Sequence, residues 1–290
     1  MQLTKQQLKE IAVFGIAGNF AEHLNQAGED ADFLKIKTQE ANAPKGIFPI
    51  YIPGHPSFLG TFPLSDQQLQ ADFSHPINVQ MEPELCVLFK VEYEENHAIR
   101  QLTPQAFAAF NDCSIRRPNA TKISQKKNWG VNSTGISSHW ISLDQFDTGG
   151  HLDAFQIACY LKRGDHIKPY GIDSPVVNYS YFYQPLQQWL IETFNNQTDF
   201  GPLEDLRHLL STANYPKQLI ISLGATRYTP YGETTFLKPD DQLGIFVYNS
   251  EQLTPQDLIN QLESPSRDLA DNTISSLIQT VSDVNKNTKN

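Results

Sequence analysis

Three features are scarce in this sequence, and each scarcity excludes a class of protein. Its 290 residues include only three cysteines, Cys86, Cys113 and Cys159, which lie far apart and form no CxxC pair. This spacing argues against both a disulfide framework and a zinc site. Long hydrophobic runs are also missing, since the first apolar run, 11–17, is too short for a signal peptide or a membrane span. We therefore expect a soluble, cytoplasmic protein in a reducing compartment, with no membrane partner.

Positive charge is the third scarcity. Lys and Arg number 22 against 32 Asp and Glu, which gives a formal net charge of −10. Such a chain lacks the basic surface that phosphate backbones require, so we expect no nucleic-acid partner. One stretch collects the basic residues Arg116, Arg117, Lys122, Lys126 and Lys127. This stretch is either a solvated loop or a local positive patch that attracts a small anionic substrate.

The remaining composition is that of a folded chain. Hydrophobic residues make up 39% and charged residues 19%, which is enough for a core and too little charge for disorder. Short apolar runs between Pro/Gly turns indicate a β-rich α+β fold with few long helices. We divide the chain into an N-terminal strand–helix and lid region (1–75), a core (76–264) and a helical, fraying C-terminal tail (265–290).

Local patterns predict the individual elements. Apolar runs of strand length lie at 11–17, 79–93, 176–183, 219–223 and 243–248. Capping signals and helical periodicity predict helices at 20–27, at 103–110 behind Thr103-Pro104, at 186–194 and after Thr254-Pro255. In the tail, one helical stripe is formed by Ile274, Leu277, Ile278 and Val281.

Three carboxylates are the strongest functional signal. Glu82 and Glu84 open an apolar strand, and residues i and i+2 of a strand point to the same side. Two neighbouring anions repel unless a positive group lies between them. A divalent cation such as Mg²⁺ would satisfy them, since it prefers oxygen ligands. The third ligand would come from elsewhere in the chain, and Asp112 is the best candidate; the alternative is that all three are ordinary strand and turn residues.

Four segments, taken in order, resemble the fumarylacetoacetate hydrolase superfamily. Glu82-Pro83-Glu84-Leu85 is similar to its E-x-E-L metal strand, and 111–116 (NDCSIR) is similar to its N-D-x-S-x-R segment. Residues 13–23 resemble its N-terminal strand, turn and helix ending in a histidine. Residues 219–224, followed by 236–240 (FLKPD), resemble its late strand and F-L-K-P-G-D turn. The ordered set spans about residues 10 to 248.

The resemblance implies a fold, a cofactor and a chemistry. The fold would be a mixed, rolled β-sheet with short peripheral helices, and the protein would be a homodimer. The cofactor would be Mg²⁺, with Ca²⁺ or Mn²⁺ as alternatives. The reaction would be hydrolysis or lysis of a C–C bond in a small 2-oxo or β-diketo acid, through a metal-stabilised enolate.

The resemblance also implies roles for single residues. Glu82, Glu84 and Asp112 would hold the ion. Lys127, a loose match to the lysine of the family's G-K-S-F-D stretch, and Arg116 would hold the substrate's carboxylate. The alternatives are a solvated loop for Lys127 and a structural salt bridge for Arg116.

A further group would surround the reacting atoms. His23 would act as general base on a water molecule, because histidine titrates near neutral pH; alternatively it is a surface or packed histidine. Gln26, three residues on, could orient the His23 ring, and Asn119 stands where the family often has glutamine. Both are expected to bind substrate.

Several positions depart from the family's pattern. Gly18 stands in place of arginine, Gln26 in place of glutamate and Arg117 in place of aspartate. Because the resemblance implies that these positions surround the substrate, two alternatives stay open. One is a decarboxylase or isomerase, which needs no attacking water, and the other is a non-catalytic binding protein that retains the scaffold.

Overall fold

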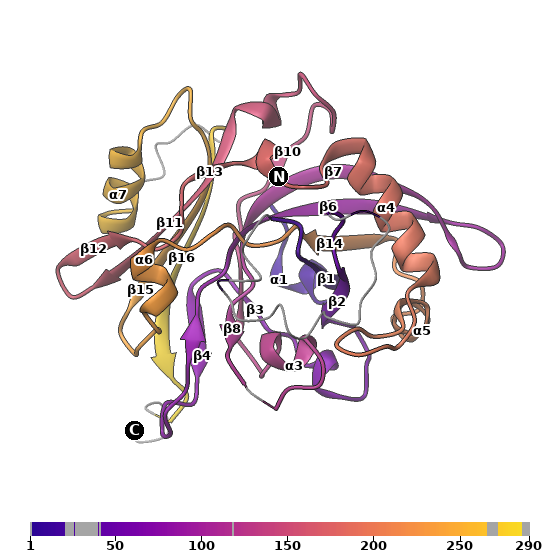
Figure 1. Ribbon diagram of the computed structural model, residues 1–290, viewed down its shortest axis with the longest axis horizontal. Coiled ribbons are helices and arrows are strands. Elements are labelled where there is room, and N and C mark those ends of the chain that lie inside the picture. Colours follow the sequence, from indigo (N-terminus) through magenta and orange to yellow (C-terminus); the bar gives the residue numbers. More distant parts are fainter. Residues whose placement is uncertain are drawn as a thin grey trace.

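Two β-sheets lie side by side in the computed structural model, and helices cover their outer surfaces (Figure 1). The structure describes residues 2–20, 26, 40, 42–117, 119–265 and 272–285. The eight-stranded sheet carries the candidate site, and the six-stranded sheet supports it from one side. The expected β-rich α+β fold is confirmed, and few helices are longer than two turns.

The eight-stranded sheet has the order β2-β1-β14-β6-β7-β9-β3, with β10 paired to β7. Strands β1 and β14 are parallel, while β14, β6 and β7 pair antiparallel, so the sheet is mixed. Its strands are β1 (Ala12–Ala17), β2 (Gly46–Tyr51), β3 (Leu64–Ser65), β6 (Pro83–Tyr93), β7 (Ile99–Asn111), β9 (Thr134–Ile136), β10 (Ile141–Ser142) and β14 (Gln218–Ser222).

The six-stranded sheet has the order β12-β11-β15-β16-β4, with β13 paired to β11. Its strands are β4 (Gln68–Ala71), β11 (Phe155–Arg163), β12 (His166–Pro169), β13 (Ser174–Pro175), β15 (Gln242–Asn249) and β16 (Ile274–Asp283). A two-stranded ribbon of β5 (Val79–Gln80) and β8 (Ser114–Ile115) joins the segments that flank the site.

Helices are short and peripheral. They are α1 (Lys5–Leu8), α3 (Ser124–Lys127), α4 (Tyr183–Asn196), α5 (Leu206–Thr212), α6 (Pro230–Thr234) and α7 (Pro255–Glu263). Local rules explain α7, because Thr254 and Asp257 form a capping box and Pro255 occupies the first turn. Helices α4 and α7 confirm two of the predicted helices.

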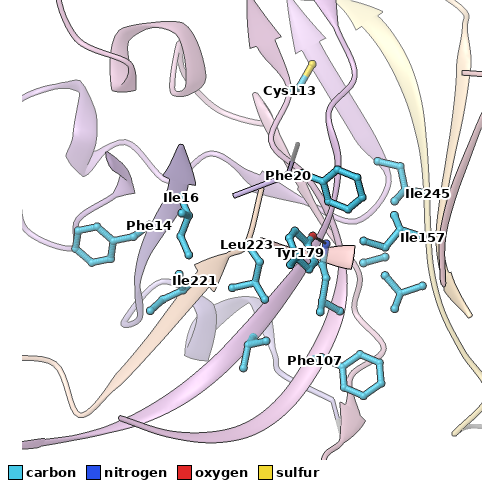
Figure 2. Packing of buried hydrophobic residues seen from close by; sticks show 14 of the residues in the cluster. Phe14, Ile16, Phe20, Phe107, Cys113, Ile157, Tyr179, Ile221, Leu223 and Ile245 are labelled. Atoms are coloured by element: carbon cyan, nitrogen blue, oxygen red, sulfur yellow. Dashed lines mark hydrogen bonds between the residues drawn. The ribbon is translucent and has the colours of Figure 1, made fainter. Parts of the chain in front are cut away.

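An apolar core joins the two sheets. It contains alternate residues of β6 (Leu85, Val87 and Phe89) together with Ile157 of β11 and Ile245 of β15. Figure 2 shows Phe107, Tyr179 and Leu223 facing Ile157 and Ile245 across this core. The intervening residues Cys86 and Leu88 enter a second core on the opposite face. Period-two alternation thus assigns Glu84 to the Cys86 face, as the sequence predicts.

The helix predicted at 103–110 is wrong, because these residues belong to strand β7. Thr103-Pro104 is a helix-start signal, yet the run from Phe107 to Phe110 is entirely buried and pairs along β6. Proline cannot donate to a sheet ladder and is tolerated at irregularities. Pro104 lies at such a point, where the register between β6 and β7 shifts after Leu88.

The helical tail predicted for 265–290 is also wrong within the residues described, since 274–283 form β16. This strand lies between β15 and β4 and is parallel to β4. Ser275, Leu277, Gln279 and Val281 are buried at period two, which is the alternation of a strand. The helical stripe arose because Leu277 and Val281 fit both periods, whereas Ile278 is only partly buried.

A strand predicted at 176–183 is replaced by a 3₁₀ turn (Val176–Asn178) and the start of α4. The buried residues Val176, Tyr179 and Phe182 are spaced by three, which is a helical rather than a strand spacing. The helix predicted at 20–27 lies almost entirely outside the described residues.

Candidate metal centre

Glu82, Glu84 and Asp112 converge at one end of the β6–β7 pair. The pairing places Pro83 opposite Asn111, so the residues that flank these two positions meet. The backbone N–H of Asp112 donates to the carbonyl oxygen of Glu82 at 3.0 Å. Each side chain offers one oxygen such that all three oxygens lie within 4.8 Å of one another, and all three residues are buried. The antiparallel pairing thereby brings two distant segments into one carboxylate cluster.

Glu84 is held from the neighbouring strand β14. Its Oε2 accepts a hydrogen bond from the Ser222 hydroxyl and another, of 2.8 Å, from the backbone N–H of Gly224. Gly224 has a φ of 114°, a conformation that a side chain would strain, and this frees its N–H to face the carboxylate. Burial, followed by the nearby Asp112, raises the pKa of Glu84 well above its usual range, although Lys127 opposes this shift.

Lys127 ends the short helix α3 and points into the cluster. Its Nζ lies 2.6 Å from Oε2 of Glu82 and 2.7 Å from Oδ2 of Asp112, and it donates to the Asp112 carbonyl oxygen at 3.1 Å. The Phe48 ring lies 5.6 Å from the same ammonium. The side chain is only 3% exposed, so the solvated-loop alternative for Lys127 is wrong.

Arg116 closes the other side of Glu82. Its Nη2 lies 2.8 Å from Oε1 of Glu82, and its Nε donates to Gln80 at 2.7 Å. Nη2 also donates to the Tyr228 hydroxyl at 3.1 Å. These contacts fix the guanidinium as a salt-bridge partner, which is the structural alternative for this residue. The next residue, Arg117, is exposed.

Negative charge exceeds positive charge in this buried site when all three carboxylates are ionised. Three carboxylates face the two cations Lys127 and Arg116. A cavity of about 20 Å³ adjoins the carboxylates and Lys127, with 16–20 and Gly224 as further walls. That volume suits a water molecule or a small ion. Hard oxygen donors with surplus negative charge fit Mg²⁺, Ca²⁺ or Mn²⁺ better than a soft metal.

The other predicted residues are placed less centrally. His23 lies outside the described residues. Gln26 uses both ends of its amide on the backbone of Tyr228, accepting from the N–H at 2.9 Å and donating to the carbonyl at 3.3 Å. Asn119 is exposed in a turn. The structure therefore joins Lys127 and Arg116 to the carboxylates and leaves Asn119 at the surface.

Sequence reasoning missed several residues that build the site. Ser222 and Gly224 hold Glu84, and Gln80 and Tyr228 hold Arg116. The signal for the first pair was a glycine directly after a buried strand, which often marks an unusual backbone conformation. No local signal marks Tyr228, because its contact depends on how the segment after β14 folds back.

The sequence matches a known family over most of its length. The model of a family of unknown function, DUF5718, matches residues 29–281, so the chain belongs to that family. No curated protein sequence matches this chain. Among the described residues, no helix is both long and apolar enough to cross a membrane.

Solved structures share the fold at low identity. A protein from Yersinia pestis CO92 assigned to the fumarylacetoacetate hydrolase family is 14% identical, with 93% of each chain covered and a TM-score of 0.50. Cg1458, solved with an inhibitor, is 16% identical, with 94% of this chain and 77% of that chain covered and a TM-score of 0.52. A 2-keto-3-deoxyarabinonate dehydratase is 14% identical, with 94% and 74% covered and a TM-score of 0.51. The chain thus has the fumarylacetoacetate hydrolase fold that its motifs predict, in a divergent sequence.

Proposed function

We propose that this protein is an enzyme that uses a divalent cation, Mg²⁺ in the first instance, to cleave a C–C bond in a small 2-oxo or β-diketo acid. The observation that carries the proposal is the buried cluster of Glu82, Glu84 and Asp112, in which acidic groups outnumber cations. Ionisation of all three carboxylates would bury a surplus negative charge, which is unfavourable, and a bound cation would compensate it. The fold and the ordered motifs support the same chemistry.

Glu82, Glu84 and Asp112 would hold the ion through one oxygen each. When bound, the ion would polarise the substrate's carbonyl oxygen and stabilise the negative charge that develops there. Ser222 and the Gly224 N–H would keep the Glu84 carboxylate oriented, which is the usual task of groups behind a metal ligand.

The cations beside the cluster would hold an anionic substrate. Lys127 lines the small cavity and carries an ammonium that could pair with a carboxylate in a buried site. Arg116 would keep Glu82 in place rather than bind substrate directly, because its guanidinium already contacts Glu82, Gln80 and Tyr228. His23 would take a proton from the attacking water.

The name of one structural neighbour supports the substrate class. The 2-keto-3-deoxyarabinonate dehydratase is named for a substrate that is a 2-keto acid. We propose a small 2-oxo acid as the ligand of this chain as well. We also propose a homodimer, which sedimentation equilibrium would test.

The second candidate is a decarboxylase or isomerase of the same substrate class. Gln26 favours it, because this position carries an amide in place of the carboxylate that would assist an attacking water. Both ends of the amide are bonded to the Tyr228 backbone. Decarboxylation and isomerisation need the stabilised negative charge but no water nucleophile.

Two substrates separate these activities. Hydrolysis of acetylpyruvate and decarboxylation of oxaloacetate are measured with Mg²⁺ and with EDTA, for the wild type, Asp112→Ala and His23→Ala. We expect Mg²⁺-dependent turnover that Asp112→Ala abolishes. If His23→Ala spares decarboxylation but removes hydrolysis, the protein is a hydrolase with His23 as base. Full turnover by Asp112→Ala would contradict the proposed function. Mg²⁺ binding without turnover of either substrate would support the alternative of a non-catalytic binding protein.

A further inference from the structure

Lys127 contacts two of the three carboxylates that would hold the proposed ion. Its ammonium bridges Oε2 of Glu82 and Oδ2 of Asp112 at 2.6 and 2.7 Å, and these residues are two of the three carboxylates in the cluster. An ion that binds between these carboxylates meets an ammonium already in contact with both. The two cations therefore compete for the same two carboxylates.

The sum of the charges in the site indicates which kind of ligand would release Lys127 from Glu82 and Asp112. Metal ligation requires ionised carboxylates, so the loaded site has three negative charges. Lys127, Arg116 and a divalent ion together supply four positive charges, which leaves a surplus of one in a buried place. A ligand with a single carboxylate removes this surplus. The balanced state therefore contains the ion and a monoanionic ligand together.

The surroundings of Lys127 allow such an exchange. Lys127 lines the 20 Å³ cavity, together with Gly18 and Asn19, so an ion in the cavity and a ligand carboxylate at its mouth would both lie against the ammonium. The aromatic face of Phe48 lies 5.6 Å from the ammonium and stabilises a cation next to the cluster. Arg116 is less free to move, because the side chains of Glu82, Gln80, Tyr228 and Ser114 all contact its guanidinium.

We propose that Lys127 acts as an internal competitor of the metal ion, and that a ligand carboxylate, by drawing the ammonium away from Glu82 and Asp112, couples its own binding to that of the ion. This inference rests on the proposed function. It makes Lys127 a positioning residue that lets the ion bind firmly only when a 2-oxo acid is present. An ion-loaded protein without ligand would be a minor species.

Titration calorimetry with MgCl₂ tests the coupling. The probe is pyruvate, a 2-oxo acid with one carboxylate, and Mg²⁺ affinity is measured with and without saturating pyruvate. The variants are Lys127→Met and Lys127→Gln. The matched control is Lys122→Met, which removes one positive charge from the same segment, where Nζ contacts Asp199 at 2.8 Å rather than the cluster.

For the wild type and Lys122→Met we expect pyruvate to tighten Mg²⁺ binding about tenfold, within the usual range of coupling between sites. Lys127→Met and Lys127→Gln should bind Mg²⁺ alone about tenfold more tightly than the wild type, and pyruvate should then add less than about twofold. If pyruvate merely chelates the ion, both Lys127 variants should show the same pyruvate-dependent increase in Mg²⁺ affinity as the wild type.

The outcomes separate this inference from the proposed function. Mg²⁺ binding by the wild type that is as tight without pyruvate as with it overturns the competitor role, and this result needs no variant to fold. Equal Mg²⁺ affinity of the wild type and both Lys127 variants also overturns it, while the metal centre stands. No Mg²⁺ binding by any of these proteins, with or without pyruvate, overturns the proposed function itself.

Discussion

The carboxylate cluster and the Arg163–Asp241 pair are both buried acidic sites, but their charges are balanced differently. Asp241, which follows the 236–240 turn, is 1% exposed. Its two carboxylate oxygens accept hydrogen bonds of 2.7 Å from Nε and Nη2 of Arg163. Its Oδ2 also accepts one of 2.7 Å from the backbone N–H of Lys238. One carboxylate thus meets one guanidinium in a bidentate pair. The cluster instead gathers three carboxylates around two cations.

The charge balance separates buried acids that indicate a function from those that only support the fold. A bidentate pair satisfies both partners and ties β11 to the turn before β15, so structure alone accounts for it. The third carboxylate of the cluster is not accounted for by structure, because its ionisation without a metal ion would bury a surplus charge and destabilise the protein. Burial by itself therefore identifies neither site, and the charge balance distinguishes them.

The largest expected effect is on metal binding. Glu84→Gln removes a charged ligand and should weaken Mg²⁺ binding by at least about 100-fold, whereas Asp241→Asn should leave it unchanged within about twofold. Calorimetric titration in the presence of pyruvate measures both. Equal weakening by the two substitutions would mean that the cluster is no more a metal site than the pair is.

The free energy of unfolding should respond to the same two substitutions in the opposite order, with the larger loss for Asp241→Asn. Asp241→Asn leaves Arg163 with a neutral partner and should lower the free energy of unfolding by about 1–3 kcal/mol, less than for a fully buried pair because Arg163 is 35% exposed. Glu84→Gln, without metal, should leave stability unchanged or raise it by about 1 kcal/mol, because an acceptor for Ser222 and Gly224 is retained. Urea denaturation in EDTA compares them. Destabilisation of similar size in both variants would contradict the difference in charge balance.

The pH dependence of stability sharpens the same contrast. The pKa of Glu84 is raised in the folded protein, so the folded state holds a proton that the unfolded state loses. Stability of the metal-free protein should therefore fall as the pH rises above the unfolded carboxyl pKa of about 4.3, by up to about 1.4 kcal/mol per pH unit. Glu84→Gln should remove this contribution, as urea denaturation between pH 5 and 8 would show. Identical pH profiles of wild type and variant would contradict it.

Glu204 provides a third, milder case. Burial raises its pKa to about 7, although its hydrogen bond from Ser124 and the charge of Lys122 oppose the shift. The sign is the same as for Glu84, so its contribution is present below pH 4.3 and is lost as the pH rises toward 7. Glu204→Gln should flatten the stability profile between pH 5 and 7 by about 1–2 kcal/mol. Thermal unfolding across this range checks it, and an unchanged slope would show that Glu204 titrates normally.

Much of the cluster could be predicted from the sequence, because strand alternation is a local property of the chain. Strand alternation places Glu84 opposite Leu85 and Val87, and the structure has this arrangement. The link to Asp112 came from the ordered motifs rather than from strand pairing. Part of that pairing was mispredicted, because Thr103-Pro104 resembles a helix start although β7 runs through it.

The placement of Lys127 could not be derived in the same way. Helix α3 has four residues, and its last side chain is held by Glu82, Asp112 and Phe48 from other elements. Each of these contacts is non-local, so nothing in the local sequence distinguishes a buried ammonium from a solvated one. The tail was misread for a related reason, because a helix and a strand fit the spacing of Leu277 and Val281 equally well until β15 and β4 are in place.

Features that depend on near neighbours could be read from the sequence alone: the cap of α7, the alternation of β6, and the position of Glu84 on the strand face opposite Leu85. Which charged groups come into contact depends on the folded arrangement of the whole chain. The balance among Glu82, Glu84, Asp112, Lys127 and Arg116 arises where separate segments converge in a buried space. Electrostatic energies depend on the distance between charges and on their burial, and the local sequence determines neither of these quantities.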